Sequence, residues 1–122
     1  MAVEDRNGKR KKAHRRGHVA EYLAALYLMV KGYRILALRY RTPLGEIDII
    51  ARKGNLVAMV EVKARKAETM AVDAVSFESQ KRIRAAADIW RTRMRGTAHL
   101  SLRFDIVAIL PWSWPRHFRD AF

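Results

Sequence analysis

Asp48, Glu61 and Lys63 are the residues of this sequence whose types and spacing are best suited to chemistry. Each charged group lies inside an apolar, β-branched run, residues 47–50 for the first and residues 56–64 for the other two. Charges in such runs are seldom buried unless they are paired, hydrogen-bonded or bound to a metal. Carboxylate oxygens suit Mg²⁺ and Mn²⁺. We therefore predict a divalent-metal site with a lysine beside it.

The two acids are predicted to face each other across a β-hairpin. Residues 46–51 and 56–64 have the composition of strands, and Gly54-Asn55 between them suits a two-residue turn. With that turn the pairing places Asp48 opposite Glu61, at a Cβ separation of roughly 4.5–5.5 Å. An odd-length loop or a bulge would break this register. Because like charges directly opposed are destabilising, the pairing itself favours a cation between them.

Three further groups are candidates for the same site. Lys63 projects from the same face of its strand as Glu61, where it could orient the attacking water and stabilise the charge that develops on phosphorus. The backbone carbonyl of Val62 is a candidate additional metal ligand. Gln80, near the start of the second predicted helix, could position water or phosphate.

The first helix is predicted from Gly17 to Lys31, with Gly32 ending it. Four of its residues form one apolar stripe at helical spacing, and the helix is expected to be deeply packed: Val19, Leu23, Leu26 and Val30. Ala20, Ala24, Ala25 and Leu28 extend the apolar surface around most of the helix. Glu21 is the only charged residue between Val19 and Val30. It is a candidate third acid for the metal site, and a solvated position is an alternative of equal weight.

The charge balance indicates a polyanionic partner. The chain has 25 Lys and Arg against 12 Asp and Glu, a formal net charge of +13. Such a field favours nucleic acid or an anionic membrane surface, although solubility or ribosome association would also account for it. We expect nucleic acid, with DNA favoured over RNA. The basic side chains expected to contact phosphates are Arg15, Arg16, Arg65, Lys81, Arg82 and Arg84.

Several classes of function are excluded or disfavoured. Without cysteine there are no disulfides, thiolate metal sites or cysteine nucleophile, which fits a cytoplasmic protein. No run of 18 apolar residues is present, so a membrane-spanning helix is not expected. The sequence has neither an HExxH pair nor a Gly-rich phosphate loop, which leaves zinc-protease and nucleotide-binding functions unsupported.

The predicted architecture is one α/β domain with a mixed, mostly antiparallel sheet flanked by helices. Residues 1–16 are predicted to be a flexible basic arm, residues 17–110 the domain, and residues 111–122 an aromatic and basic tail. Within the domain we expect a helix, strands at 33–40, 46–51 and 56–64, a helix from 77 to 94 capped by Ser76, and a strand at 100–110.

Two smaller features of the C-terminal part complete these expectations. Arg103 and Asp105 lie on one face of the last strand by alternation and are interpreted as an ion pair. In the tail, packing of Trp112 and Trp114 onto the body is favoured over their stacking on unpaired bases.

The ordered set Glu21, Asp48 and Glu61-Val62-Lys63 resembles the restriction-endonuclease-like PD-(D/E)XK nuclease superfamily, and its spacing is similar to that of archaeal Holliday-junction resolvases. More closely, roughly residues 17–110 resemble the YraN-like family of small bacterial proteins. The matching motifs are Gly17-x-x-x-Glu21, Gly45-Glu46-Ile47-Asp48, Val60-Glu61-Val62-Lys63-x-Arg65, Gln80-Lys81 and Arg103-Phe104-Asp105. The resemblance implies an αβββαβ core and a metal-dependent nuclease site, with Ile47 where the superfamily motif has proline.

The leading functional expectation is Mg²⁺- or Mn²⁺-dependent hydrolysis of phosphodiester bonds in DNA, with branched or junction DNA as the substrate considered first. Symmetric cutting of two strands would need a homodimer. The alternative is a non-catalytic module that binds DNA or ribosome-associated RNA and keeps the acids for structure or as a vestigial site. Such a module would bind with a steep salt dependence and without any effect of divalent metal.

Overall fold

The computed structural model describes residues 18–67, 71 and 75–122, with a five-stranded sheet at the centre. The strands follow one another across the sheet in chain order: β1 (Arg34–Arg41), β2 (Glu46–Lys53), β3 (Leu56–Ala64), β4 (Ser101–Ile109) and β5 (Arg116–Phe118). Neighbouring strands are antiparallel except β3 and β4, which are parallel because α3 (Phe77–Arg93) lies between them in the chain. The predicted α/β class, mixed sheet and element order are confirmed.

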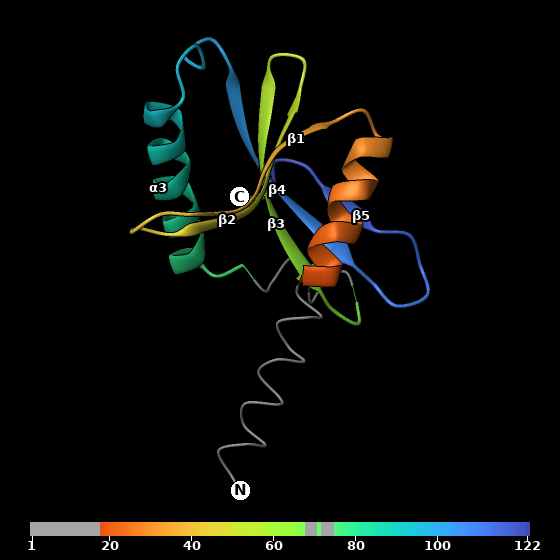
Figure 1. The fold of residues 1–122 in the computed structure, drawn as a ribbon. Coiled ribbons are helices and arrows are strands. Elements are labelled where there is room, and N and C mark those ends of the chain that lie inside the picture. Colours follow the sequence, from red (N-terminus) through yellow and green to blue (C-terminus); the bar gives the residue numbers. More distant parts are fainter. Residues whose placement is uncertain (1–17, 68–70, 72–74) are drawn as a thin grey trace, which may run out of the picture.

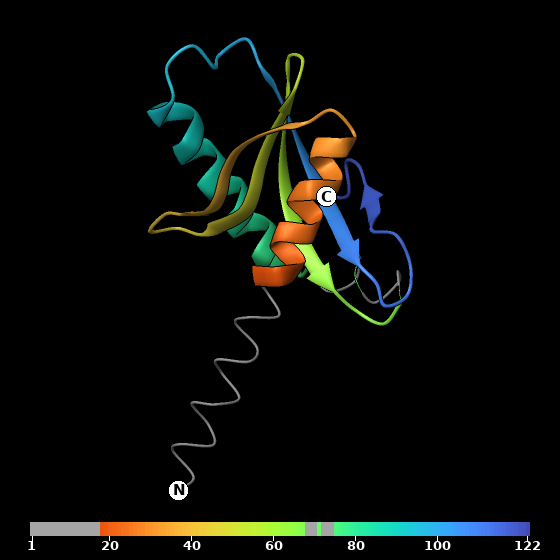
Figure 2. The same cartoon turned by 45° about the vertical axis from the view of Figure 1, so that its right-hand side comes forward.

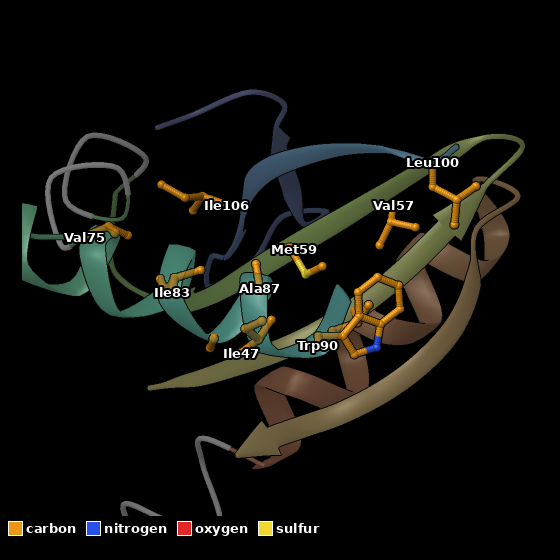
Figure 3. Packing of buried hydrophobic residues seen from close by; sticks show 11 residues of the cluster. Ile47, Val57, Met59, Val75, Ile83, Ala87, Trp90, Leu100 and Ile106 are labelled. Atoms are coloured by element: carbon orange, nitrogen blue, oxygen red, sulfur yellow. The ribbon is translucent and has the colours of Figure 1, made fainter. Parts of the chain in front are cut away.

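The two main helices cover opposite faces of the sheet, as both views show (Figures 1 and 2). The first helix, residues 18–30, packs its small residues against a cluster that includes Ile49, Val60 and Val107. On the other face α3 packs Ile83 and Trp90 against a second cluster, seen from close by in Figure 3. The sheet is therefore buried on both faces, which explains the continuous apolar runs in β2 and β3.

The first helix is buried on one face, so the prediction that it is deeply packed around most of its circumference is wrong. Val19, Leu23, Leu26 and Val30 are 47–80% exposed, whereas Ala20, Ala24, Ala25 and Leu28 are buried. Small side chains allow the helix axis to approach the sheet closely. The prediction failed because an apolar composition on several sides of a helix does not show which of those sides a sheet will cover.

The β2–β3 hairpin has the predicted register. Lys53 pairs with Leu56 and Ile49 with Val60, so Gly54-Asn55 is the two-residue turn. Gly54 has a φ of +60°, a conformation that glycine adopts without steric cost. The register in turn fixes where the acids of β2 and β3 meet.

The segment after β4 contains a strand that sequence analysis missed. β5 pairs with β4 through Ile106–Phe118 and Ala108–Arg116. The turn between the two strands carries Trp112 and Trp114 outward, where they are 103% and 82% exposed. The prediction that these rings pack onto the body is therefore wrong.

Candidate metal centre

Asp48 and Glu61 meet where the paired part of the hairpin ends. The ladder runs as far as Ile49 and Val60. Beyond it, the backbone N–H of Val62 donates a hydrogen bond of 2.8 Å to Oδ2 of Asp48. The Asp48 carboxyl also lies close enough to the side chain of Glu61 to raise the pKa of the Glu61 carboxyl. The hairpin thus brings together the two acids that the sequence singles out, with the Asp48 carboxylate held by the backbone of β3.

The environment of Glu61 disfavours its negative charge. Burial raises the pKa of this carboxyl and the neighbouring Asp48 raises it further, giving a net value of about 9. Glu46 acts in the same direction, whereas the ammonium of Lys63 acts against it. At neutral pH the pair therefore holds a proton between two carboxyls, which is a position that a cation could take.

The raised pKa predicts that Glu61→Gln stabilises the protein when metal is absent. The unfolded side chain titrates near pH 4.3, so stability is lost as the pH rises from there towards the folded value. We expect the variant to gain about 1–2 kcal/mol at pH 8 and to lack this part of the pH dependence. Thermal denaturation in EDTA between pH 5 and 9 measures both, and parallel curves for the two proteins would contradict the prediction.

Both Glu61 and Lys63 face the side of the sheet that α3 covers. Along β3, Val57 and Met59 pack in the α3 cluster, and Val60 packs in the cluster under the first helix. Alternation then turns Glu61 and Lys63 towards α3. The ammonium of Lys63 is close enough to affect the titration of Glu61. This agrees with the predicted position of the lysine beside the acids.

The basic part of α3 lies against the strand that carries Asp48. A Cβ built on Gly45, at the entrance to β2, would lie 2.4 Å from the carbonyl oxygen of Arg82. Arg82 is exposed, and the cations of Lys81 and Arg84 lie over aromatic rings, those of Phe77 and Phe104 respectively. The backbone of α3 at Arg82 therefore lies against the chain just before β2.

Glu21 does not reach the pair in this structure. Its Oε2 accepts a 2.8 Å hydrogen bond from Nη1 of Arg39, on β1. The first helix packs on the face of the sheet opposite to Glu61, which accounts for the separation. Across the described residues, no three His, Asp or Glu side chains gather as metal ligands. The centre therefore consists of Asp48 and Glu61.

The other predicted site residues have individual positions. The amide of Gln80 donates to the carbonyl of Val75 at 3.3 Å, at the start of α3. Arg65 is exposed, and its guanidinium donates to the carbonyl of Ala64. Arg15 and Arg16 lie outside the described residues. The Val62 carbonyl stays a predicted ligand.

A second polar centre surrounds Asp105, which is completely buried. Arg103 donates to both of its carboxylate oxygens at 2.7–2.8 Å, so the predicted ion pair is confirmed. Nε2 of His117 and the N–H of Asp120 also bind this carboxylate. Burial alone would raise the pKa of Asp105, but the hydrogen bonds from His117, Arg103 and Asp120 lower it to about 2. Sequence analysis missed His117 because β5 was treated as part of a tail, although Arg116-His117-Phe118 has strand alternation.

The fold and the hairpin acids define a small α/β protein with a two-carboxylate centre on a basic body. The comparisons with known proteins agree on one family. Residues 20–109 match the model of Uncharacterised protein family UPF0102, so the chain belongs to this family. UPF0102 protein Atu0303 of Agrobacterium fabrum is 66% identical to it, and UPF0102 proteins of Rhizobium leguminosarum bv. trifolii and Rhizobium johnstonii are 64% and 63% identical. Each alignment covers the full length of both chains.

Among the residues that the structure describes, no helix is long and apolar enough to cross a membrane.

Proposed function

We propose that this protein is a Mg²⁺- or Mn²⁺-dependent nuclease of the PD-(D/E)XK type that hydrolyses phosphodiester bonds in DNA. The contact between Asp48 and Glu61 carries the proposal, because it brings two carboxyls together in a partly buried position on a chain with a net charge of +13. The resemblance of the ordered acids and Lys63 to that superfamily, and to the YraN-like family, supports the same reaction.

The donor set fits a hard divalent cation. Asp48 and Glu61 would hold it, with the Val62 carbonyl as a further oxygen ligand, and such ions typically use one or two protein carboxylates. When bound, the ion supplies an activated water and polarises the phosphoryl group. The hydrogen bond from Val62 to Oδ2 of Asp48 fixes the orientation of that carboxylate before any ligand arrives.

The chain's own residues have separable roles in this scheme. Lys63 faces the same side as Glu61 and would bind a phosphate oxygen and stabilise charge on phosphorus. Lys81, Arg82 and Arg84 on α3 would bind the flanking phosphates, and Arg65 follows directly on β3. Gln80 would have to leave the Val75 carbonyl to position water, and Glu21 would have to leave Arg39 to become a third ligand.

Calorimetric titration with Mn²⁺ tests the centre itself. Asp48→Asn keeps an oxygen that can accept the Val62 N–H, so it should remain folded while losing most of its affinity for the metal. Asp88→Asn, at an exposed position of α3, is the matched control and should bind like the wild type. Equal binding by wild type and Asp48→Asn would refute this centre.

The nuclease activity is tested on a four-way junction, a flapped duplex and a linear duplex of the same sequence. We expect Mn²⁺-dependent cleavage of a branched substrate that Lys63→Ala lowers by at least about a hundredfold, the usual scale for loss of a group that stabilises transition-state charge. Unchanged cleavage by Lys63→Ala or Asp48→Asn would contradict the mechanism. Sedimentation of the protein on junction DNA tests the homodimer that symmetric cutting requires.

The ion pair between Glu21 and Arg39 favours a second candidate function. In it, the protein is a module that binds DNA or ribosome-associated RNA without cutting it. With Glu21 paired to Arg39, the centre has one acid fewer than the motif resemblance implies. For such a module, EDTA and Asp48→Asn would leave nucleic-acid binding unchanged, and neither DNA nor RNA would be cleaved.

A further inference from the structure

The turn between β4 and β5 presents aromatic rings to solvent in a way that packing does not explain. Trp112 and Trp114 are almost wholly exposed, and Trp112 has a φ of +62°. The third tryptophan, Trp90, is only 3% exposed and packs in the core under α3, as Figure 3 shows. Two large apolar side chains held at the tip of one turn suit contact with a flat, apolar ligand face.

A cationic cavity adjoins this turn. It has a volume of about 630 Å³ and is lined by Tyr27 and Lys31 from the end of the first helix and by Trp114, Arg116 and His117 from the β5 region. A more apolar cavity of about 380 Å³ shares Tyr27 and Trp114 with it and continues along the first helix. Aromatic and cationic groups therefore line two cavities that meet at Tyr27 and Trp114.

The Asp105 centre holds Lys31 at the cavity through His117. Nζ of Lys31 lies 2.6 Å from Nδ1 of His117, whose Nε2 binds Asp105 at 2.7 Å. Burial lowers the pKa of Lys31, and the neighbouring cations Arg119 and Lys53 lower it further. Lys31 and Arg116 line the cavity, and a bound phosphate would offset the repulsion between Lys31 and its neighbouring cations.

We propose that the β4–β5 turn and this cavity bind an unpaired nucleotide of single-stranded DNA, with its base stacked on Trp114 and its phosphate held by Lys31 and Arg116. The inference rests on the proposed function only in taking a DNA strand as the ligand. Stacked aromatic rings beside a basic groove are the usual means of binding single strands, because each unpaired base offers a flat face that duplex DNA conceals.

The sheet separates this pocket from the proposed catalytic centre, because the first helix lines the pocket whereas Glu61 faces α3. Glu61 is in register with Ile106 of β4, which pairs with Phe118 of β5. Two strand spacings of about 4.8 Å separate the acid-bearing end of β3 from β5, roughly 10 Å in all.

Tryptophan fluorescence provides a direct test. The full-length protein is titrated in EDTA with a 20-nucleotide oligo(dT) and, separately, with a blunt 20-base-pair duplex. We expect oligo(dT) to quench the exposed tryptophans strongly and the duplex to bind with little quenching, since Trp90 is shielded in the core. Equal quenching by both ligands would overturn the inference.

Variants identify the residues responsible. Trp114→Ala should weaken oligo(dT) binding by about tenfold or more and change duplex binding less than twofold. Lys31→Gln should weaken oligo(dT) binding and reduce its salt dependence by about one phosphate contact. Phe77→Ala, which removes an exposed aromatic ring on α3, is the matched control and should bind oligo(dT) like the wild type.

Two further outcomes separate this inference from its rivals. Asp48→Asn should bind oligo(dT) as the wild type does. The pocket inference would therefore stand even if the nuclease proposal were refuted. Oligo(dT) binding that is unaffected by both Trp114→Ala and Lys31→Gln would refute the pocket. Concentration-dependent self-association that buries the tryptophans and blocks oligo(dT) would also refute it, because a second copy of the chain would then be the occupant.

Discussion

Gly45→Ala is expected to destabilise the protein by about 3 kcal/mol and to impair metal binding at the same time. A Cβ at this position would lie 2.4 Å from the carbonyl oxygen of Arg82 and 2.9 Å from its carbonyl carbon, so backbone rather than a flexible side chain stands in the way. Relief requires α3 to move away from β2, which disturbs the packing of Ile83 and Ala87 beneath it. The melting temperature should fall by about 10 °C.

Two other glycines provide matched controls for this effect. Gly54 and Gly96 have φ values of +60° and +77°, and nothing lies within 4 Å of a Cβ at either position. Alanine there should cost only about 1–2 kcal/mol through backbone strain and leave Mn²⁺ affinity unchanged. If Gly45→Ala proved no more destabilising than these two variants, or bound Mn²⁺ normally, the close contact between β2 and α3 would not be what positions the acids.

Asp105→Asn is expected to cost about 3 kcal/mol, since it leaves the positive charge of Arg103 partly buried without its partner. The carboxylate accepts four hydrogen bonds, from two guanidinium nitrogens, one imidazole nitrogen and one backbone N–H. An asparagine cannot accept all of them, because one of its two side-chain termini is a donor. Chemical denaturation at pH 7 measures the loss, and exposed Asp88→Asn should cost nearly nothing.

The same carboxylate predicts how stability changes in acid. Its pKa is lowered in the folded protein to about 2, so its contribution is present above the unfolded value near 3.9 and is lost as the pH falls from there towards 2. The expected contribution is about 2 kcal/mol. Asp105→Asn should lack this step between pH 4 and 2, and a variant with the same acid dependence as the wild type would contradict the assignment.

The parts of the fold that sequence analysis predicted correctly depend on local rules. The Gly54-Asn55 turn fixes the register of β2 and β3 whatever surrounds them, so the meeting of Asp48 and Glu61 follows from a few neighbouring residues. Ser76 accepts a hydrogen bond from the N–H of Ser79 and begins α3 as predicted. Turn and cap chemistry act over two or three residues, which is the range that a single sequence reveals.

The parts that were missed depend on contacts between distant segments. Helical periodicity shows that the first helix is apolar on several sides, but the alanine face is chosen by the approach of the sheet. Glu21 shares that alanine side of the helix, yet its partner Arg39 belongs to β1, and no spacing within the helix predicts this pair. β5 has only three residues and gains its place through β4 and Asp105, which a local pattern cannot show.

The Asp105 centre also sets an order in which the chain can fold during synthesis. The β2–β3 hairpin needs only sequence-local contacts, so it can form as soon as both strands have left the ribosome. By contrast, Arg103 of this centre donates to the hydroxyl of Tyr33, 70 residues earlier in the chain. Until residues 103–120 emerge, β3 lacks its parallel partner and presents an unpaired edge. The nascent chain therefore contains the residues of its acid pair before it contains those that complete the core.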